Sequence, residues 1–241
     1  MIEYTSYFQG LLNSVILCTI TALLTMLSAA LCGYGFAKFQ FKGKILMFGV
    51  VILSIVIPPQ TVMLSLFSKF RYFDIFGLLR IITGDTIVLT GSFLPAAILA
   101  VTGFGFRGGL FIFLMRQFYS GLPKELLEAA YVDGASVYRT YFSIIFPLGK
   151  TLMVTVFLLS FSWMWTDTFY ANILYSDINI VSRIIAQSQS TIGSAGVVAG
   201  TLVSAMYVNT ATILVLIPLL VIFIAGQKFM VEGIESSGIV G

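Results

Sequence analysis

Long apolar runs alternate with short polar stretches along this chain of 241 residues. Each run approaches or exceeds the roughly 20 apolar residues that a helix needs to cross a bilayer. Uninterrupted runs favour helices over a β-barrel, whose strands would alternate apolar and polar residues. The pattern predicts an all-α, polytopic membrane protein with about five spans, at residues 11–37, 43–67, the second half of 86–119 ending near Phe118, 148–165 and 197–225. The part of 86–119 before the third span is expected to be irregular.

Two of the runs contain residues that disturb a membrane helix. Pro58 and Pro59 interrupt the second run, and a proline removes a backbone donor and kinks a helix. This pair is either a simple kink near the outer end of the span or a hinge on a transport path. Arg107 lies among glycines in the third run, where it is either a functional residue or an arginine that snorkels to the interface.

Small residues recur at helical spacing in the first run. Ser28, Ala29, Cys32 and Gly33 place small side chains along one side of the predicted helix. Such spacing suits close packing against another helix, and the alternative is an ordinary surface that faces lipid.

The composition confirms the membrane class and excludes several functions. The chain is 59% hydrophobic and 10% charged, whereas a soluble domain has about 25% charged residues. The net charge of +3 is too small and too dispersed for nucleic-acid binding. Histidine is absent, which removes the commonest metal ligand and general base. We therefore expect no metal site and no catalytic centre.

The basic residues are unevenly distributed between the flanks of the predicted spans. Four lie on one side: Lys69, Arg71, Arg80 and Arg183. Eight lie on the other: Lys38, Lys42, Lys44, Arg116, Lys124, Arg139, Lys150 and Lys228. Since cytoplasmic loops carry the excess of Lys and Arg, residues 122–147 and the C-terminus are predicted to be cytoplasmic, with residue 1 outside.

Residues 122–147, LPKELLEAAYVDGASVYRTYFSIIFP, form the longest stretch that mixes polar and apolar residues. Pro123 suits the first turn of a helix, Gly134 suits a left-handed stop, and Ser136 can cap a second helix. Leu126, Leu127, Ala130 and Tyr131 would form an apolar stripe on the first helix. The stripe either docks on a partner or packs on the chain's own bundle.

The same segment resembles the EAA signature of ABC importer permeases. That signature is EAA, three residues, glycine, nine residues, isoleucine, one residue and Leu-Pro. The matching positions here are Glu128, Ala129, Ala130, Gly134, Ile144, Phe146 and Pro147, with Phe146 in place of leucine. Other stretches, among them LLNSVILCTITALLTMLSAALCGYGFAKFQFKGK and GQKFMVEGI, resemble the carbohydrate-uptake branch, close to the maltose-type second permease.

The resemblance implies a type I importer permease in a bacterial plasma membrane. Its partners would be a second permease subunit, two ATPase subunits that bind ATP and magnesium, and an extracytoplasmic sugar-binding protein. The domain would cover residues 11–226, between an outer flank at 1–10 and a cytoplasmic tail at 227–241. The EAA helix would contact an ATPase subunit through Leu126, Leu127, Glu128, Ala129, Ala130, Tyr131, Asp133 and Gly134. This chain itself would bind no cofactor and would not be an enzyme.

Four residues are candidates for the substrate path: Asn13, Pro58, Trp165 and Asp167. Aromatic residues near the outer end of the fourth span could stack on a sugar, and their alternative role is an aromatic belt at the headgroup level. The sugar substrate follows from the resemblance alone, so a non-sugar substrate stays open.

The permeases that this chain resembles usually have six spans. Their first membrane helix precedes an Asn-Ser pair, which here is Asn13 and Ser14. We therefore expect that the first span is missing from this sequence.

Two other classes of function, a membrane enzyme and an ion-coupled secondary transporter, have less support. Gly149-Lys150-Thr151 is similar to the end of a phosphate-binding loop, but such a loop needs a glycine at position 144, where isoleucine stands. An ion-coupled secondary transporter needs acids inside its spans, whereas the acids here fall in loops, tails or, for Asp167, at the outer end of a span.

Overall fold

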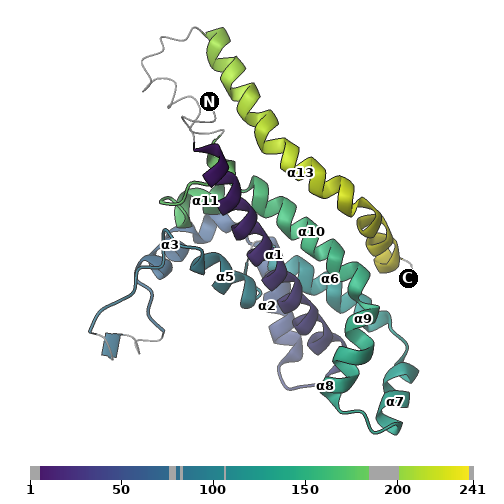
Figure 1. Cartoon of the computed structure of the whole chain (residues 1–241). Coiled ribbons are helices and arrows are strands. Elements are labelled where there is room, and N and C mark those ends of the chain that lie inside the picture. The colour runs from purple at the N-terminus through teal and green to yellow at the C-terminus, as the bar shows by residue number, and fades with distance from the viewer. Residues whose placement is uncertain (1–5, 76–79, 82–83, 106, 185–200, 239–241) are drawn as a thin grey trace. The chain divides into compact units, whose positions relative to one another are not determined.

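The computed structural model describes residues 6–75, 80–81, 84–105, 107–184 and 201–238 (Figure 1). Helices account for most of these residues, and the only β contact among them is an isolated antiparallel bridge between Phe73 and Ile87. The elements in chain order are α1 (Tyr7–Lys38), α2 (Lys44–Val56), η1 (Pro59–Val62), α3 (Met63–Arg71), α5 (Leu94–Val101), α6 (Gly108–Gly121), α7 (Lys124–Val132), α8 (Val137–Thr140), η2 (Tyr141–Ile145), α9 (Phe146–Leu148), α10 (Lys150–Thr166), α11 (Phe169–Leu174) and α13 (Thr201–Gly238).

The predicted all-α membrane class is confirmed. Within the described residues, two helices are long and apolar enough to cross a membrane unaided, Tyr7–Lys38 and Val208–Phe229. The number rises to as many as 4 when each of two interrupted helix pairs counts as one span. The first four residues of the predicted span 197–225 lie outside the described part of the chain.

Within the predicted span 43–67, which the sequence analysis expected Pro58 and Pro59 to interrupt, the chain stops being helical at the proline pair. α2 ends at Val56, and Ile57 and Pro58 are both extended, with ψ of 119° and 134°. A residue that precedes proline is pushed out of the helical region by the proline ring, and here two residues in a row precede one. A 3-10 turn and α3 follow as separate elements. The prolines therefore make a break rather than a kink.

The stretch before the third predicted span is also more ordered than the sequence indicated. A short helix, α5, occupies part of the region that we expected to be irregular. Between α5 and α6, Gly103 and Arg107 adopt left-handed backbone angles, with φ of 74° and 57°. Arg107 is the residue that precedes α6, so a non-glycine residue bears the left-handed conformation there.

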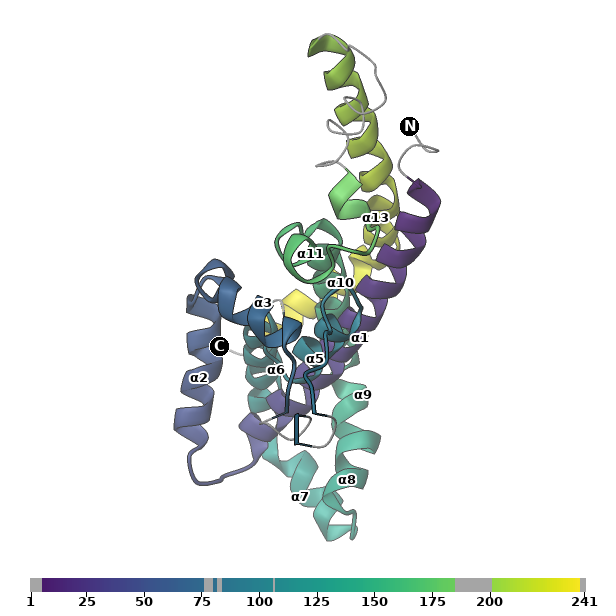
Figure 2. The ribbon, with the colours of Figure 1, turned by 90° about the vertical axis from the view of Figure 1, so that its left-hand side faces the viewer.

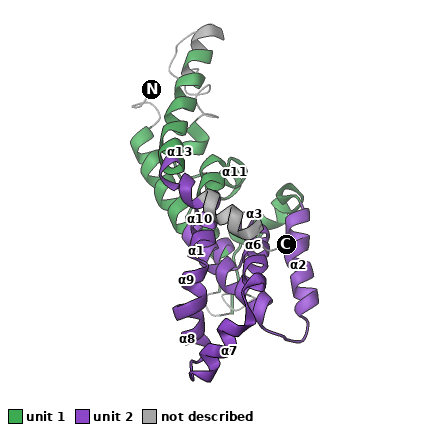
Figure 3. Cartoon of the chain, turned by 90° about the vertical axis from the view of Figure 1, so that its right-hand side faces the viewer, with its two compact units in different colours: residues 1–20, 58–98, 161–223 green, residues 21–57, 99–160, 224–241 purple. Residues whose placement is uncertain are grey.

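The chain forms two compact units (Figure 3), each of which gathers segments that are far apart in sequence. Unit 1 contains residues 1–20, 58–98 and 161–223. Its core includes the buried residues Trp165, Leu174 and Tyr175. Two backbone hydrogen bonds tie its segments together: Gly91 donates to Leu174, and Leu89 donates to Phe70.

Unit 2 contains residues 21–57, 99–160 and 224–241. Gly33 of α1 is pressed against α6, since an added Cβ there would lie 2.6 Å from the Cβ of Met115. On the same helix, the Ser28 hydroxyl donates to the Ala100 carbonyl over 2.7 Å. The small residues of the first span therefore face protein, and the close-packing interpretation is confirmed.

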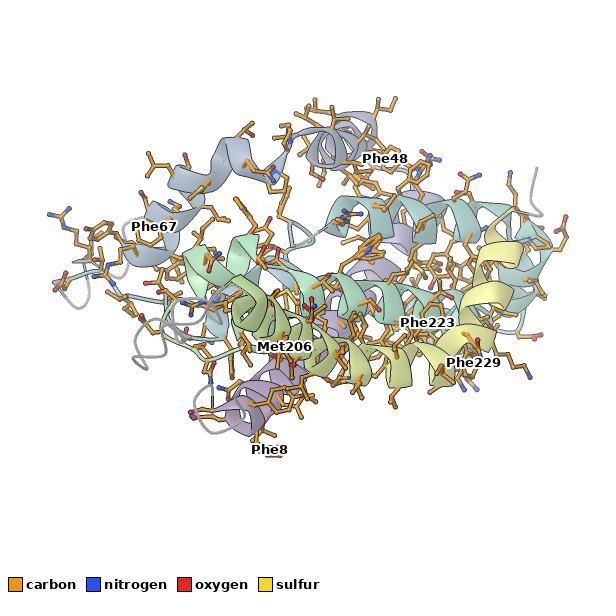
Figure 4. The ribbon with its side chains drawn as sticks, turned by 90° about the horizontal axis from the view of Figure 1, so that it is seen from above. Phe8, Phe48, Phe67, Met206, Phe223 and Phe229 are labelled. Atoms are coloured by element: carbon orange, nitrogen blue, oxygen red, sulfur yellow. The ribbon has the colours of Figure 1, made fainter. Side chains whose placement is uncertain are left out.

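α2 lies beside α6 within unit 2 (Figure 2). Phe48 of α2 lies on this side of its helix (Figure 4), where its ring stacks on Phe113 with 6.4 Å between centroids. The Arg116 guanidinium carbon lies 4.1 Å from the centroid of the Phe48 ring, a cation–π contact. α2 is otherwise exposed along its apolar length, as expected of a helix that meets lipid.

Candidate functional site

α7 forms the first half of the polar segment and has the boundaries that its sequence dictates. Pro123 is the residue before the helix, and Glu125 lies in the first turn, where a negative charge complements the positive end of the helix dipole. At the other end, Gly134 has φ of 75°. Its N–H donates to Tyr131 over 3.0 Å, and the Ala135 N–H donates to Ala130 over 2.9 Å. These two bonds make a Schellman motif, which stops the helix sharply.

A second short helix begins directly after this stop. Ser136 caps α8, and its hydroxyl accepts the N–H of Arg139 over 3.3 Å. α8 continues into η2, a π-helix of five residues, and then into α9. α7, α8 and α9 lie together at one end of unit 2 (Figure 1). The predicted helix, turn and capped second helix are thus present at the predicted residues.

Both ends of the polar segment are attached to neighbouring helices of unit 2. At its start, the Lys38 ammonium at the end of α1 donates to the Leu122 carbonyl over 2.9 Å. At its end, buried Tyr141 of η2 packs on Tyr34 of α1 with 4.9 Å between ring centroids. Tyr34 also meets Tyr119 of α6 at 5.9 Å. A displacement of α7 and α8 would therefore also displace α1 and α6.

The apolar residues of α7 divide between the inside of the unit and solvent. Ala130 is 5% exposed and packs against the rest of its own unit, whereas Leu126 and Tyr131 are exposed. Glu128, Ala129, Asp133 and Gly134 are also exposed, and Leu127 is half-buried. The predicted contact residues are thus mostly presented to solvent, and Ala130 is the one that anchors the helix from behind.

Sequence reasoning missed three exposed apolar side chains in the same segment. Val132 is 87% exposed, Tyr138 is 79% exposed, and Phe142 is also exposed. Tyr138 and Phe142 are four residues apart, which places them on one side of the second helix. Continuing the apolar stripe past Gly134 would have found Tyr138 and Phe142. We call these three residues, with exposed Leu126, the outward apolar face.

The four substrate-path candidates lie in unit 1, each with surroundings of its own. The Asn13 amide donates to the Asn179 carbonyl over 2.9 Å. Pro58 lies at the break after α2, and Trp165 is 1% exposed with its indole N–H on the Val215 carbonyl at 3.0 Å. Their role in a substrate path stays a prediction.

Asp167 lies immediately after α10 and is 8% exposed. Its carboxylate accepts the N–H groups of Tyr170 at 2.9 Å and Ala171 at 3.2 Å, which holds the first turn of α11. Burial raises the pKa of Asp167 to about 6, and these backbone bonds oppose the rise. The pKa of the neighbouring Tyr170 is raised to about 12 by burial, so Tyr170 stays neutral while Asp167 titrates.

The raised pKa of Asp167 predicts a protein that is more stable in mild acid. The folded state holds the proton up to about pH 6, whereas the unfolded chain releases it near pH 3.8. Stability is therefore greatest below pH 4 and falls as the pH rises through 6, by at most about 3 kcal/mol. Asp167→Asn keeps a capping oxygen and should flatten this dependence in thermal unfolding between pH 4.5 and 8. The same substitution at exposed Asp133 should leave the pH dependence in place, and an unchanged profile in Asp167→Asn would contradict the assignment.

Residues 11–235 match the protein family described as "Binding-protein-dependent transport system inner membrane component". The chain belongs to this family. It is thus a multi-pass component of the inner membrane, as its apolar helices also indicate. The family description identifies the chain as a component of a transport system.

Several curated members of the family resemble the chain along nearly its whole length. It is 27% identical over 239 residues to the melibiose/raffinose/stachyose import permease MelC of Bacillus subtilis, covering 99% of this chain and 78% of that protein. It is 26% identical to the arabinooligosaccharides permease AraQ of the same organism, with 98% and 74% covered. The sn-glycerol-3-phosphate permease UgpE of Yersinia pestis is 28% identical, with 97% and 74% covered.

The fold has a counterpart among solved structures. A chain from a bacterial ABC transporter that imports the acidic polysaccharide alginate superposes with a TM-score of 0.70 at 16% sequence identity. The match covers 92% of this chain and 74% of the other. At this level of identity the likeness concerns the fold alone.

Proposed function

We propose that this chain is a permease subunit of an ABC importer for sugars or oligosaccharides. It would form the translocation path with a second permease, receive substrate from an extracytoplasmic binding protein, and be driven by two ATPase subunits that bind ATP and magnesium. Membership of the binding-protein-dependent family supports this proposal. The names of MelC and AraQ favour oligosaccharides as the substrate class.

The observation that carries the proposed coupling role is the outward apolar face next to the EAA residues. α7 has nine residues and is too short to be stable alone in water, so it needs packing partners. Ala130 supplies one contact from inside, and the outward apolar face is available to another subunit. The conformation of this segment is set by its Schellman stop and Ser136 cap. It can therefore act as a rigid docking element.

In this mechanism the ATPase subunits move the segment and the segment moves the spans. ATP binding would close the ATPase pair, and α7 and α8 would follow the surface on which they dock. The Lys38–Leu122 hydrogen bond and the Tyr141–Tyr34 contact would carry that movement to α1. The path would then open alternately to the two sides of the membrane. The C-terminal tail would share the cytoplasmic side with the docking segment.

Placing a charge on the outward apolar face tests the coupling role. Val132→Asp should lower import and substrate-stimulated ATP hydrolysis by about tenfold, because a buried unpaired carboxylate costs more than about 1.4 kcal/mol at a docked surface. The measurement is uptake and phosphate release in proteoliposomes that contain the whole transporter.

Val88→Asp is the matched control, since Val88 is also exposed but lies outside the polar segment 122–147. It should leave ATP hydrolysis near the wild-type value. Normal coupling in Val132→Asp, or an equal loss in both variants, would contradict the docking role.

The substrate class is tested by isolation from the native membrane. Purification of the chain in mild detergent should recover the second permease and the ATPase subunits. The binding protein that restores stimulated ATP hydrolysis should respond to an oligosaccharide. A response to a non-sugar solute alone would leave the importer in place and correct its substrate.

A further inference from the structure

Pro218 interrupts the hydrogen-bond pattern of α13 without ending the helix, which runs from Thr201 to Gly238. In an α-helix each N–H donates to the carbonyl four residues earlier, and proline has no N–H to donate. The carbonyl that loses its donor at Pro218 is that of Leu214. The carbonyl of Val215 is the next along the helix, on the same turn.

Both carbonyls receive a hydrogen bond from a side chain on a different helix. The Tyr7 hydroxyl of α1 donates to the Leu214 carbonyl over 2.8 Å. The Trp165 indole N–H of α10 donates to the Val215 carbonyl over 3.0 Å. Tyr7 and Trp165 are both buried and belong, with the two carbonyls, to unit 1. Tyr7 therefore supplies the donor that the helix lacks at Leu214, and Trp165 adds a second hydrogen bond at the neighbouring carbonyl.

There is a physical reason for placing side-chain donors next to Pro218 in a membrane helix. A carbonyl without a donor in an apolar surrounding costs free energy, because no water is present to replace the missing bond. α13 is otherwise weakly held, since only 11% of its most apolar window, within Val208–Phe229, is buried. Its exposed side chains include Met206 and Phe223, which Figure 4 labels. The hydrogen bonds from Tyr7 and Trp165 thus count for more than they would in a fully packed helix.

We propose that Tyr7 and Trp165 are positioning residues that hold α13 at Pro218 and make α13 follow α1 and α10 during transport. We call Tyr7, Trp165 and the carbonyls of Leu214 and Val215 the Pro218 clamp. α13 passes from unit 1 into unit 2 between Phe223 and Ile224, little more than one turn beyond the proline. The clamp therefore holds the helix just before it enters the other unit. Its transport consequence rests on the proposed function, and its structural consequence does not.

A double-mutant cycle with Pro218→Ala tests the clamp. Tyr7→Phe removes only the hydroxyl and should lower the unfolding temperature of the detergent-solubilised full-length protein by roughly 3–6 °C. Pro218→Ala restores an N–H for the Leu214 carbonyl, so in that background Tyr7→Phe should lower it by less than about 1 °C. Trp165→Phe should keep its effect in the Pro218→Ala background, because the restored N–H serves the Leu214 carbonyl and not the Val215 carbonyl to which Trp165 donates. If Tyr7→Phe lowers the unfolding temperature equally in both backgrounds, or in neither, the clamp is overturned.

Two control variants distinguish the effect of losing the clamp from the effect of losing any polar contact. The Thr155 hydroxyl donates to the Phe229 carbonyl of α13 over 2.9 Å, away from the proline. Thr155→Val should therefore lower the unfolding temperature by the same amount in the wild-type background and in the Pro218→Ala background. Tyr72→Phe removes a hydroxyl from an exposed tyrosine and should have no effect in either background.

The transport readout is the number of ATP molecules hydrolysed per substrate imported. In the whole transporter, Tyr7→Phe should raise this ratio about threefold, because α13 follows its neighbours less faithfully. An unchanged ratio would overturn the positioning role. If the reconstituted wild-type transporter imports no substrate, the proposed function fails, while the thermal cycle still decides the clamp.

Discussion

Replacing Gly134 with valine should reduce import and stimulated ATP hydrolysis by at least about tenfold. Gly134 has φ of 75°, and a Cβ added there would meet nothing within 4 Å. The expected defect is therefore one of backbone conformation, since a β-branched residue is strained in the left-handed region by more than about 1–2 kcal/mol. The Schellman stop would be lost, and α7 and α8 would take a different relative orientation. Uptake and ATP hydrolysis in proteoliposomes measure the effect.

Gly43 provides the matched control for this variant. It has φ of 85°, has equally open space around an added Cβ, and lies between α1 and α2 rather than in the docking segment. Gly43→Val introduces comparable local strain and should keep most of the stimulated ATP hydrolysis. Full coupling in Gly134→Val would contradict the docking role of the segment, and so would an equal loss in both variants.

Replacing Gly33 with valine should destabilise the fold of unit 2. The new Cβ would lie 2.6 Å from the Met115 Cβ and 2.8 Å from the Arg116 backbone nitrogen, so α1 and α6 would be forced apart. Overpacking of this kind costs about 3 kcal/mol. The unfolding temperature in detergent should fall by roughly 6–12 °C.

Gly35 lies two residues further along the same helix, and an added Cβ there would meet nothing within 4 Å. Gly35→Val should be nearly neutral, because valine has a somewhat better helix propensity than glycine. A small effect of Gly33→Val, close to that of Gly35→Val, would show that α1 and α6 separate at little cost. The small-residue contact would then not be a determinant of stability.

The polar segment was predictable in detail because its signals are local. The start at Pro123, the stop at Gly134 and the cap at Ser136 each depend on residues within about one helical turn. The spacing of the EAA residues adds a family signature that needs no knowledge of the fold. What this stretch of sequence could not show is which apolar residues turn inward. Ala130 and Val132 are two residues apart, and packing buries the first and exposes the second.

The spans were predicted with less detail. Apolar run length located the helices, but it did not separate α2 from α3. The backbone angles of Ile57 and Pro58 show why, since two successive residues that precede proline leave the helical region. The proline pair was visible in the sequence, but the interpretation as a kink did not anticipate that the helix would end there. The roles of Asn13, Pro58, Trp165 and Asp167 in a substrate path stay predictions.

By itself the sequence determined the membrane class and the local architecture of the polar segment, because hydrophobic run length and capping act over short distances along the chain. Only the tertiary structure decided which polar groups meet. Asn13 bonds to the Asn179 carbonyl, and Tyr7 reaches the Leu214 carbonyl across a separation of 207 residues. Pairings of this kind depend on which helices become neighbours. A donor and its acceptor have no sequence signal in common when a different helix supplies each of them.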